Sequence, residues 1–216
     1  MMPNMAECTG LWRRTLLIDT DGSRDTTADV RWLQGITAFV DLRRSGPPES
    51  SVQDGFAGWL SQSGDVFHWS RFANLRPPGP HPDAGRMSWD GDTLIEVGVH
   101  ADYVEHWVRD ASGCGRPDSP CWGLTLGGAD GAEGLLLRVG DLFALAQRVA
   151  ERVEISLGGV DCTSWLITDS ALPYREGCFV NPRLGGNELR MDDVDEDGTA
   201  SVRRWIVKDS EGSVEL

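Results

Sequence analysis

The chain has 216 residues and a formal net charge of −14, with 34 acidic against 20 basic side chains. This length suits one large all-β domain or two small ones, with room for a sizeable core. The acidic balance argues against nucleic acid and against an anionic membrane surface as partners, because both are themselves negatively charged. No apolar run approaches the length of a membrane span.

The cysteines are five in number and show no Cys-x-x-Cys spacing. The chain also opens without an apolar signal segment, so we expect a cytoplasmic protein in which all five remain free thiols. Cys114 and Cys121 flank a loop rich in Gly and Pro and could clip it, although no feature of the sequence requires that bond. Nine tryptophans are many for this length, and they suit either a thick core or an aromatic-lined pocket.

Runs of alternating side chains joined by short links recur along the chain, as in an antiparallel meander. We expect a single domain over residues 10–208, with flexible termini at 1–9 and 209–216. Asp141 suits an N-cap, and apolar residues recur on one stripe after it, which predicts a helix from Leu142 to Arg152. Residues 52–60 are ambiguous and could form one or two helical turns. In chain order, strands are expected over 11–18, 30–34, 36–43 and 66–72, then in a hairpin over 93–109, and then over 121–126, 134–139, 153–157, 164–168, 187–191 and 201–207.

The hairpin carries an unusual mixture of side chains on one face of its second strand. These side chains are Tyr103, Glu105, Trp107 and Arg109. Strand faces usually sort into apolar and polar, whereas this face combines aromatics with both charges. Because aromatic bodies favour burial, we expect Trp107 to lie inside. Period-two alternation then places Glu105 and Arg109 inside as well, together with Glu96. The proline-rich loop from Leu75 to Gly85 is expected to cover one mouth.

About ten strands with short links and one helix predict an all-β fold, a closed antiparallel barrel. Closure removes exposed sheet edges, and a barrel of eight or more strands can hold one small ligand. The segments WRRTLLIDTDG, VRWLQ and FVDLRR resemble an uncharacterised group of bacterial barrel proteins over the first half of the chain. The order of early strands, loops and a late helix is similar to the lipocalin-like (calycin) barrels. The resemblance implies a barrel and brings no known activity with it.

Several strand faces combine aromatic with charged side chains, and we expect them to converge on an interior ligand pocket. Buried charges need partners, so such a pocket would hold Arg–carboxylate pairs between indole walls. The alternative is a filled core with these charges in solvent, because strand parity alone does not tell which face is inside. The predicted ligand-binding residues are Trp32, Gln34, Asp41, Arg43, Trp69, Arg71, Glu105, Trp107 and Arg109.

Three residues are candidates for catalysis: Glu96, His68 and Tyr103. Glu96 has the apolar neighbours Leu94, Ile95 and Val97, and burial among them would raise its pKa and suit acid–base work. A structural ion pair with an arginine is the plainer alternative for Glu96. His68, beside Trp69, is a second possible base, and a surface histidine is its plainer reading.

Motifs that are missing narrow the chemistry. No G-x-S-x-G, GxGxxG, phosphate loop or H-E-x-x-H occurs, which disfavours acyl-serine hydrolysis, dinucleotide redox and nucleotide hydrolysis. Residues 193–198 copy half of a calcium loop, but Arg204 stands where a glutamate is needed, so a hairpin turn explains them better. His100 and His106 lack a ligand spacing. We therefore expect no metal and no cofactor.

The leading functional hypothesis is a cofactor-independent isomerase, cyclase or lyase that acts on an aromatic or polycyclic metabolite in the cavity. Glu96, His68 or Tyr103 would move protons, and Arg71 or Arg109 would steady developing charge. Two alternatives are a non-catalytic ligand carrier or sensor of lipocalin type and a structural domain with a filled core. The expected partner is a small molecule, with neither nucleic acid nor membrane, and the protein would be a monomer or homodimer.

Overall fold

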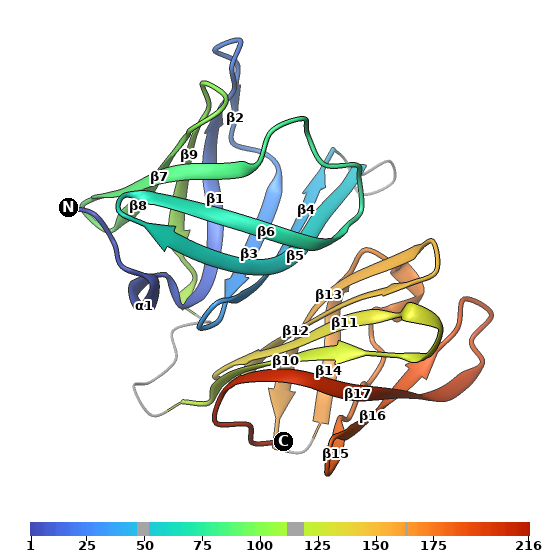
Figure 1. Cartoon of the computed structure of the whole chain (residues 1–216). Coiled ribbons are helices and arrows are strands. Elements are labelled where there is room, and N and C mark those ends of the chain that lie inside the picture. Colours follow the sequence, from blue (N-terminus) through green and yellow to red (C-terminus); the bar gives the residue numbers. More distant parts are fainter. Residues whose placement is uncertain (47–51, 112–118, 163) are drawn as a thin grey trace.

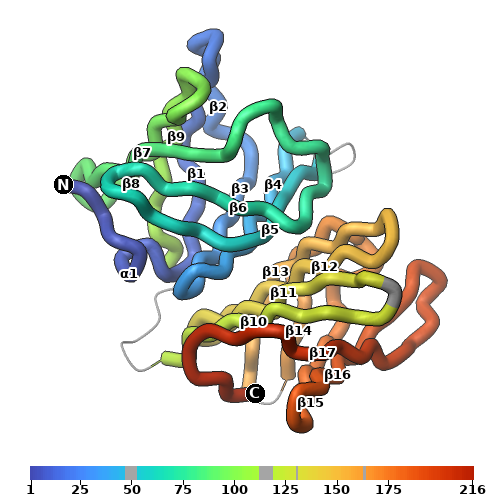
Figure 2. Tube along the Cα trace, viewed as in Figure 1, coloured from blue at the N-terminus to red at the C-terminus, as the bar shows by residue number. Residues whose placement is uncertain are grey.

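The computed structural model describes residues 1–46, 52–111, 119–162 and 164–216, in which antiparallel strands form two sheets (Figure 1). The trace in Figure 2 places the N-terminal half of the chain in one sheet and the C-terminal half in the other. The one α-helix among these residues is α1 (Met5–Cys8), and a capping box formed by Asn4 and Glu7 caps its N-terminus.

The first sheet closes on itself as an antiparallel barrel. Strand β1 pairs with β3 on one side and with β9 on the other, so eight strands form a continuous ring and β2 adds a short extra strand to β1. This result confirms the closed antiparallel barrel expected from the alternating runs. The strands of this sheet are β1 (Gly10–Ile18), β2 (Arg24–Asp25), β3 (Asp29–Gln34), β4 (Ala38–Ser45), β5 (Val52–Ser63), β6 (Val66–Asn74), β7 (Asp83–Asp90), β8 (Thr93–Gly98) and β9 (Val104–Arg109).

The second sheet has eight strands and curls around an apolar core of its own. Residue Val180 lies between β14 and β16: its N–H donates to the Trp165 carbonyl at 2.9 Å, and its carbonyl accepts from the Asp192 N–H at 2.8 Å. The strands are β10 (Cys121–Gly127), β11 (Glu133–Val139), β12 (Leu142–Val149), β13 (Arg152–Asp161), β14 (Ser164–Ser170), β15 (Arg183–Gly185), β16 (Glu188–Val194) and β17 (Ala200–Gly212); short 3-10 turns are η3 (Ala129–Gly131) and η4 (Pro173–Arg175).

The strands thus divide between two sheets, where the sequence suggests about ten in a single barrel. The expected helix over Leu142–Arg152 is wrong, because these residues form β12 and the start of β13. Both faces of β12 are buried: Phe143 and Leu145 enter the second core, while Ala144 and Ala146 face the first sheet. A strand that is apolar on both faces has no period-two signal and imitates a helical stripe.

Other segments also differ from expectation. Residues 52–60 belong to β5 and contain no helical turn. Helix α1 lies within residues 1–9, and β17 continues to Gly212, so parts of both expected flexible ends have regular structure. The acidic run 193–198 does form the expected hairpin turn, between β16 and β17, with Gly198 at φ +83°.

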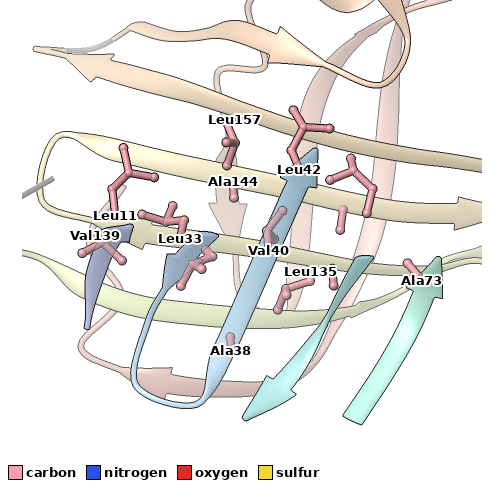
Figure 3. Close-up of a cluster of buried hydrophobic side chains, with 14 residues drawn as sticks. Leu11, Leu33, Ala38, Val40, Leu42, Ala73, Leu135, Val139, Ala144 and Leu157 are labelled. Atoms are coloured by element: carbon pink, nitrogen blue, oxygen red, sulfur yellow. The ribbon is translucent and has the colours of Figure 1, made fainter. Parts of the chain in front are cut away.

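An apolar layer joins the two sheets (Figure 3). Leu33, Val40 and Leu42 point outward from the barrel and pack against Leu137 and Leu157 of the second sheet. Leu33 alternates along β3 with inward residues, so one face of this strand builds the layer while the other faces the barrel interior. The layer therefore anchors the strands that carry the interior side chains.

We predict that Leu137→Ala lowers the free energy of unfolding by about 2–5 kcal/mol, because it opens a cavity in a fully buried layer. Urea denaturation followed by circular dichroism measures the change. The matched control is Leu184→Ala, at an exposed position of β15, which should shift stability by about 0.5 kcal/mol or less. Equal effects of the two substitutions would contradict this role for the layer.

Candidate functional site

A cavity of about 290 Å³ opens at one end of the barrel, where β1 ends and β7 begins. Its size is near the lower limit of the roughly 300–1,000 Å³ typical of small-molecule sites. The lining combines aromatic rings with arginines and carboxylates from most strands of the barrel. These residues are Arg14, Leu17, Asp19, Thr20, Trp32, Asp41, Arg43, Phe56, Trp69, Arg71, Asp83, Glu96, Ala101, Tyr103, Glu105 and Trp107.

Indole rings form the floor of the cavity. Trp32 lies at the centre, with its ring centroid 5.6 Å from Trp107 and 6.2 Å from Trp69, and both contacts are edge-to-face. Trp12 stacks on the other side of Trp32 at 6.0 Å, its partner across β1 and β3. Aromatic pairs at these separations stabilise the fold by about 0.5–1.5 kcal/mol each beyond burial, so this floor is rigid.

The opposite end of the indole cluster is covered by the N-terminal segment. The Trp12 indole N–H donates to the Cys8 carbonyl at 2.6 Å, and the first residues of the chain bond to β5 and β7. Arg109 reaches this end as well: its guanidinium lies 4.2 Å from the Trp12 ring and donates to the backbone carbonyls of Glu7 and Thr9. The described cavity therefore has its mouth at the end away from α1.

Every arginine of the cavity wall has a carboxylate partner. Arg14 contacts Glu105 at 2.6 Å, Arg43 contacts Asp41 at 2.6 Å and Glu105 at 3.8 Å, and Arg71 pairs with Asp83. The guanidiniums of Arg43 and Arg71 also lie over the Phe56 ring, 4.8 and 3.3 Å from its centroid. The arginines are thus held by carboxylates and an aromatic face, and their charges are already balanced.

Glu96 is the exception among the buried carboxyl groups of the wall. Its two oxygens accept from the Tyr103 hydroxyl at 2.8 Å and from the Trp107 indole N–H at 3.2 Å. No arginine in the described part of the chain lies within ion-pair distance of it. Burial raises the pKa of Glu96 well above its ordinary value, and the charge of Glu105, directly opposite on β9, raises it further. Both effects favour the neutral form of Glu96 over the carboxylate.

Two glycines make room for this group. A Cβ at Gly85 would lie 2.7 Å from the Glu96 Cγ, and a Cβ at Gly98 would lie 2.4 Å from the Tyr103 ring. The two glycines are paired across β7 and β8. Burial, followed by the negative charge of Glu96, also raises the pKa of Tyr103, so the phenol stays a neutral donor. The glycines thus let an acid and a phenol approach one another inside the barrel.

Most of the predicted site residues meet at this cavity. The lining includes Trp32, Asp41, Arg43, Trp69, Arg71, Glu96, Tyr103, Glu105 and Trp107. The loop before β7 lies at the mouth, as the sequence predicts: residues 78–82 border a second hollow of about 400 Å³ that shares Trp69, Arg71 and Tyr103 with the cavity. His81 of this loop stacks on His100, with ring centroids 5.7 Å apart.

Three predicted residues do not line the cavity. His68 alternates along β6 with the buried Phe67 and Trp69, so its side chain points out of the barrel. Gln34 is buried, but its amide is occupied by the carbonyls of residues 35, 37 and 38 and by the Trp32 indole N–H. Arg109 shares the inward face of Trp107 but lies at the end covered by α1.

Phe56 and Asp83 are two of the seven lining residues that the sequence does not predict, the others being Arg14, Leu17, Asp19, Thr20 and Ala101. Phe56 falls in the segment left ambiguous between strand and helix, although it is the aromatic on which two arginines stack. Asp83 follows four prolines and was assigned to the loop, whereas β7 begins at it. A signal for Asp83 is its place next to the start of an alternating run, opposite Trp69 of β6.

Other chemistry is sparse in the described residues. They contain no group of three or more His, Cys, Asp or Glu side chains placed to hold a metal ion. None of their helices is long and apolar enough to cross a membrane. The four described cysteines are free thiols. Cys114 lies outside the described residues, and with it the possible link to Cys121.

Comparisons with known proteins bear on the fold. No protein-family model matches the chain, and no curated protein matches it in sequence. Among solved structures, the fold is similar to that of YLR301w, an uncharacterised protein of Saccharomyces cerevisiae, with a TM-score of 0.61 at 12% sequence identity. The match covers 94% of this chain and 99% of the yeast chain, so it extends over both sheets.

We predict that Glu96→Gln removes a loss of stability that the wild type shows as pH rises. Unfolded Glu96 ionises above its ordinary pKa of 4.5, while the folded side chain keeps its proton. The unfolded chain then binds fewer protons, so wild-type stability falls by up to about 1.4 kcal/mol per pH unit until the folded pKa is reached. Urea titrations from pH 4 to 9 should show that the free energy of unfolding of the variant increases relative to that of the wild type as pH rises.

A control for this experiment is Asp90→Asn, which removes an exposed carboxylate next to the turn between β7 and β8. Its stability curve should run parallel to that of the wild type. A constant difference between Glu96→Gln and wild type over the whole pH range would contradict a protonated Glu96.

Proposed function

We propose that the barrel binds a small organic molecule in its cavity and acts on it as a cofactor-independent isomerase, cyclase or lyase. The observation that carries the proposal is Glu96, a buried carboxyl group in the cavity wall that has no arginine partner among the described residues and whose pKa is raised by burial. Glu105, directly opposite, is held by two arginines. Environments that separate the pKa values of two neighbouring acids are the usual basis for acid–base division of labour.

The mechanism begins with proton transfer from Glu96 to an unsaturated carbon or a heteroatom of the substrate. Positive charge then develops on the substrate next to the indoles of Trp32, Trp69 and Trp107, whose faces attract cations. A bond shift or ring closure follows, and the Glu96 carboxylate takes a proton back. Protons and electrons balance within the cycle, so an isomerisation or cyclisation of this kind needs no redox partner.

The size of the cavity indicates the size of the substrate. A volume of 290 Å³ corresponds to that of roughly ten water molecules, which favours a compound of one or two rings. The hollow under the loop at residues 78–82 adjoins the mouth and would give room for a larger polycyclic metabolite. Arg71 and Tyr103 line both spaces and would contact a substituent that reaches outward.

A non-catalytic carrier or sensor of lipocalin type is the second candidate. An eight-stranded barrel with a cavity at one end and a covered opposite end favours it, because barrels of this size commonly hold a single ligand. The two candidates share one site and differ only in turnover. A cytoplasmic location is part of either proposal, supported by the free thiols of Cys8, Cys121, Cys162 and Cys178.

We predict that Ala101→Trp blocks ligand capture. Ala101 is exposed at the mouth, so a tryptophan there would obstruct the cavity without disturbing the core. After incubation with a metabolite extract, native mass spectrometry should show a bound small molecule on the wild type and none on this variant. Ala200→Trp, at an exposed position on β17, is the matched control and should retain the ligand. Equal capture by all three proteins would place the ligand elsewhere.

Turnover separates the two candidates. With the captured compound as substrate at a concentration that saturates both proteins, Glu96→Gln should lower the rate by about 10²–10⁴-fold if Glu96 is the general acid. Asp90→Asn should leave the rate unchanged. Capture without conversion by the wild type would favour the carrier.

A further inference from the structure

We propose that the cavity selects organic cations, a quaternary or protonated amine on an aromatic or aliphatic body, and that Glu96 is the group that faces the charge of the ligand. The inference rests on the proposed ligand-binding function and names the chemical class that the site would take. Three features of the cavity support it: its charge balance, the arrangement of its indoles and the hydrogen bonds of Glu96.

The charge balance of the wall is negative. The lining carries five carboxyl groups and three arginines. Arg14, Arg43 and Arg71 each have a carboxylate partner, so no arginine of the lining is left to bind an anionic ligand. An anion entering this space would have to break an existing ion pair, whereas a cation would meet an excess of acidic groups.

The indole rings stand at steep angles to one another. The plane of Trp32 makes 64° with that of Trp69 and 70° with that of Trp107. Aromatic side chains set at such angles present faces from more than one side, which is the arrangement that holds quaternary ammonium groups. The barrel already uses the same attraction, since the Arg71 guanidinium lies 3.3 Å from the centroid of the Phe56 ring.

Glu96 is placed to pair with the charge of such a ligand. Both of its oxygens accept hydrogen bonds, from Tyr103 and from Trp107, so the donors needed by a carboxylate are in position before any ligand enters. An opposite charge within about 4–6 Å favours the ionised form of a carboxyl group. A cation on the indole floor would therefore meet a carboxyl group whose hydrogen-bond donors are already in place.

Three probes of matched shape and different charge test this inference. They are (3-hydroxyphenyl)trimethylammonium, its neutral isostere 3-tert-butylphenol, and the anion 3-hydroxybenzenesulfonate. Calorimetric titrations at pH 7 report the affinity of each probe. For the wild type we expect the cation to bind at least about tenfold more tightly than the isostere.

Three variants test whether the preference for the cation arises in the cavity. Glu96→Gln should lose most of the preference for the cation while still binding 3-tert-butylphenol. Asp90→Asn, which removes one negative charge from the surface, should behave as the wild type. Ala101→Trp should weaken binding of every probe that enters the cavity.

The outcomes separate this inference from the function on which it rests. If 3-tert-butylphenol binds as tightly as the cation and Ala101→Trp blocks it, the cavity is a ligand site and the inference on charge is wrong. The same holds if 3-hydroxybenzenesulfonate binds best, because an arginine would then be open to anions. If none of the three probes binds to the wild type, both the inference and the proposed ligand function fail.

Discussion

The barrel interior depends on the ion pairs of Glu105. A carboxylate inside an eight-stranded ring is costly unless it is paired, and removing one partner of such a buried pair typically costs about 3–5 kcal/mol. Glu105 lies on β9 and its closest cation, Arg14, lies on β1, so the pair crosses the seam at which the sheet closes. Arg43, from β4 on the far side of β3, also reaches Glu105 and brings Asp41 with it. The pairing of β1 with β9 that closes the barrel therefore also brings Glu105 to its closest cation.

This pairing also determines the character of Glu96. Glu96 and Glu105 are directly opposite each other on β8 and β9, and two neighbouring carboxylates cannot both ionise cheaply. The arginines contact Glu105, whereas burial and the neighbouring charge of Glu105 raise the pKa of Glu96. A tyrosine and a tryptophan, which donate hydrogen bonds but carry no charge, complete its surroundings. Two identical side chains thus acquire different chemistry from their neighbours alone.

The sequence carries enough information to orient the central hairpin, and less elsewhere. Placing Trp107 inside forces its period-two neighbours Glu105 and Tyr103 to the same side, which is what the structure shows. The same parity argument assigns Arg109 to the interior but does not tell at which end of the barrel it lies. His68 was assigned by its neighbour Trp69 instead of by parity, and adjacent residues on a strand face opposite ways.

Two further errors concern features that alternation along a strand does not report. In β12 an apolar residue stands at nearly every position because one face enters the core of the second sheet and the other enters the layer between the sheets. Period-two alternation appears in a sequence only where one face of a strand is exposed to solvent and the other is buried. It therefore gives no strand signal for β12. The division of strands between two sheets is hidden for a related reason, since alternation identifies strands but says little about which strands pair.

The tryptophan count is compatible with both a cavity and a filled core, and the two sheets use it in these two ways. In the second sheet Trp122, Trp165 and Trp205 pack with aliphatic side chains that fill the space between them. In the barrel the indoles of Trp32, Trp69 and Trp107 line one part of the cavity, and arginines and carboxylates line much of the rest of its wall. Those charged groups contact one another along the wall. They cannot fill the centre of the barrel as apolar side chains would, because a charge buried there without its partner would be costly. A wall made of ion pairs therefore leaves an open space above the indole floor, and that space is the site at which we place the ligand.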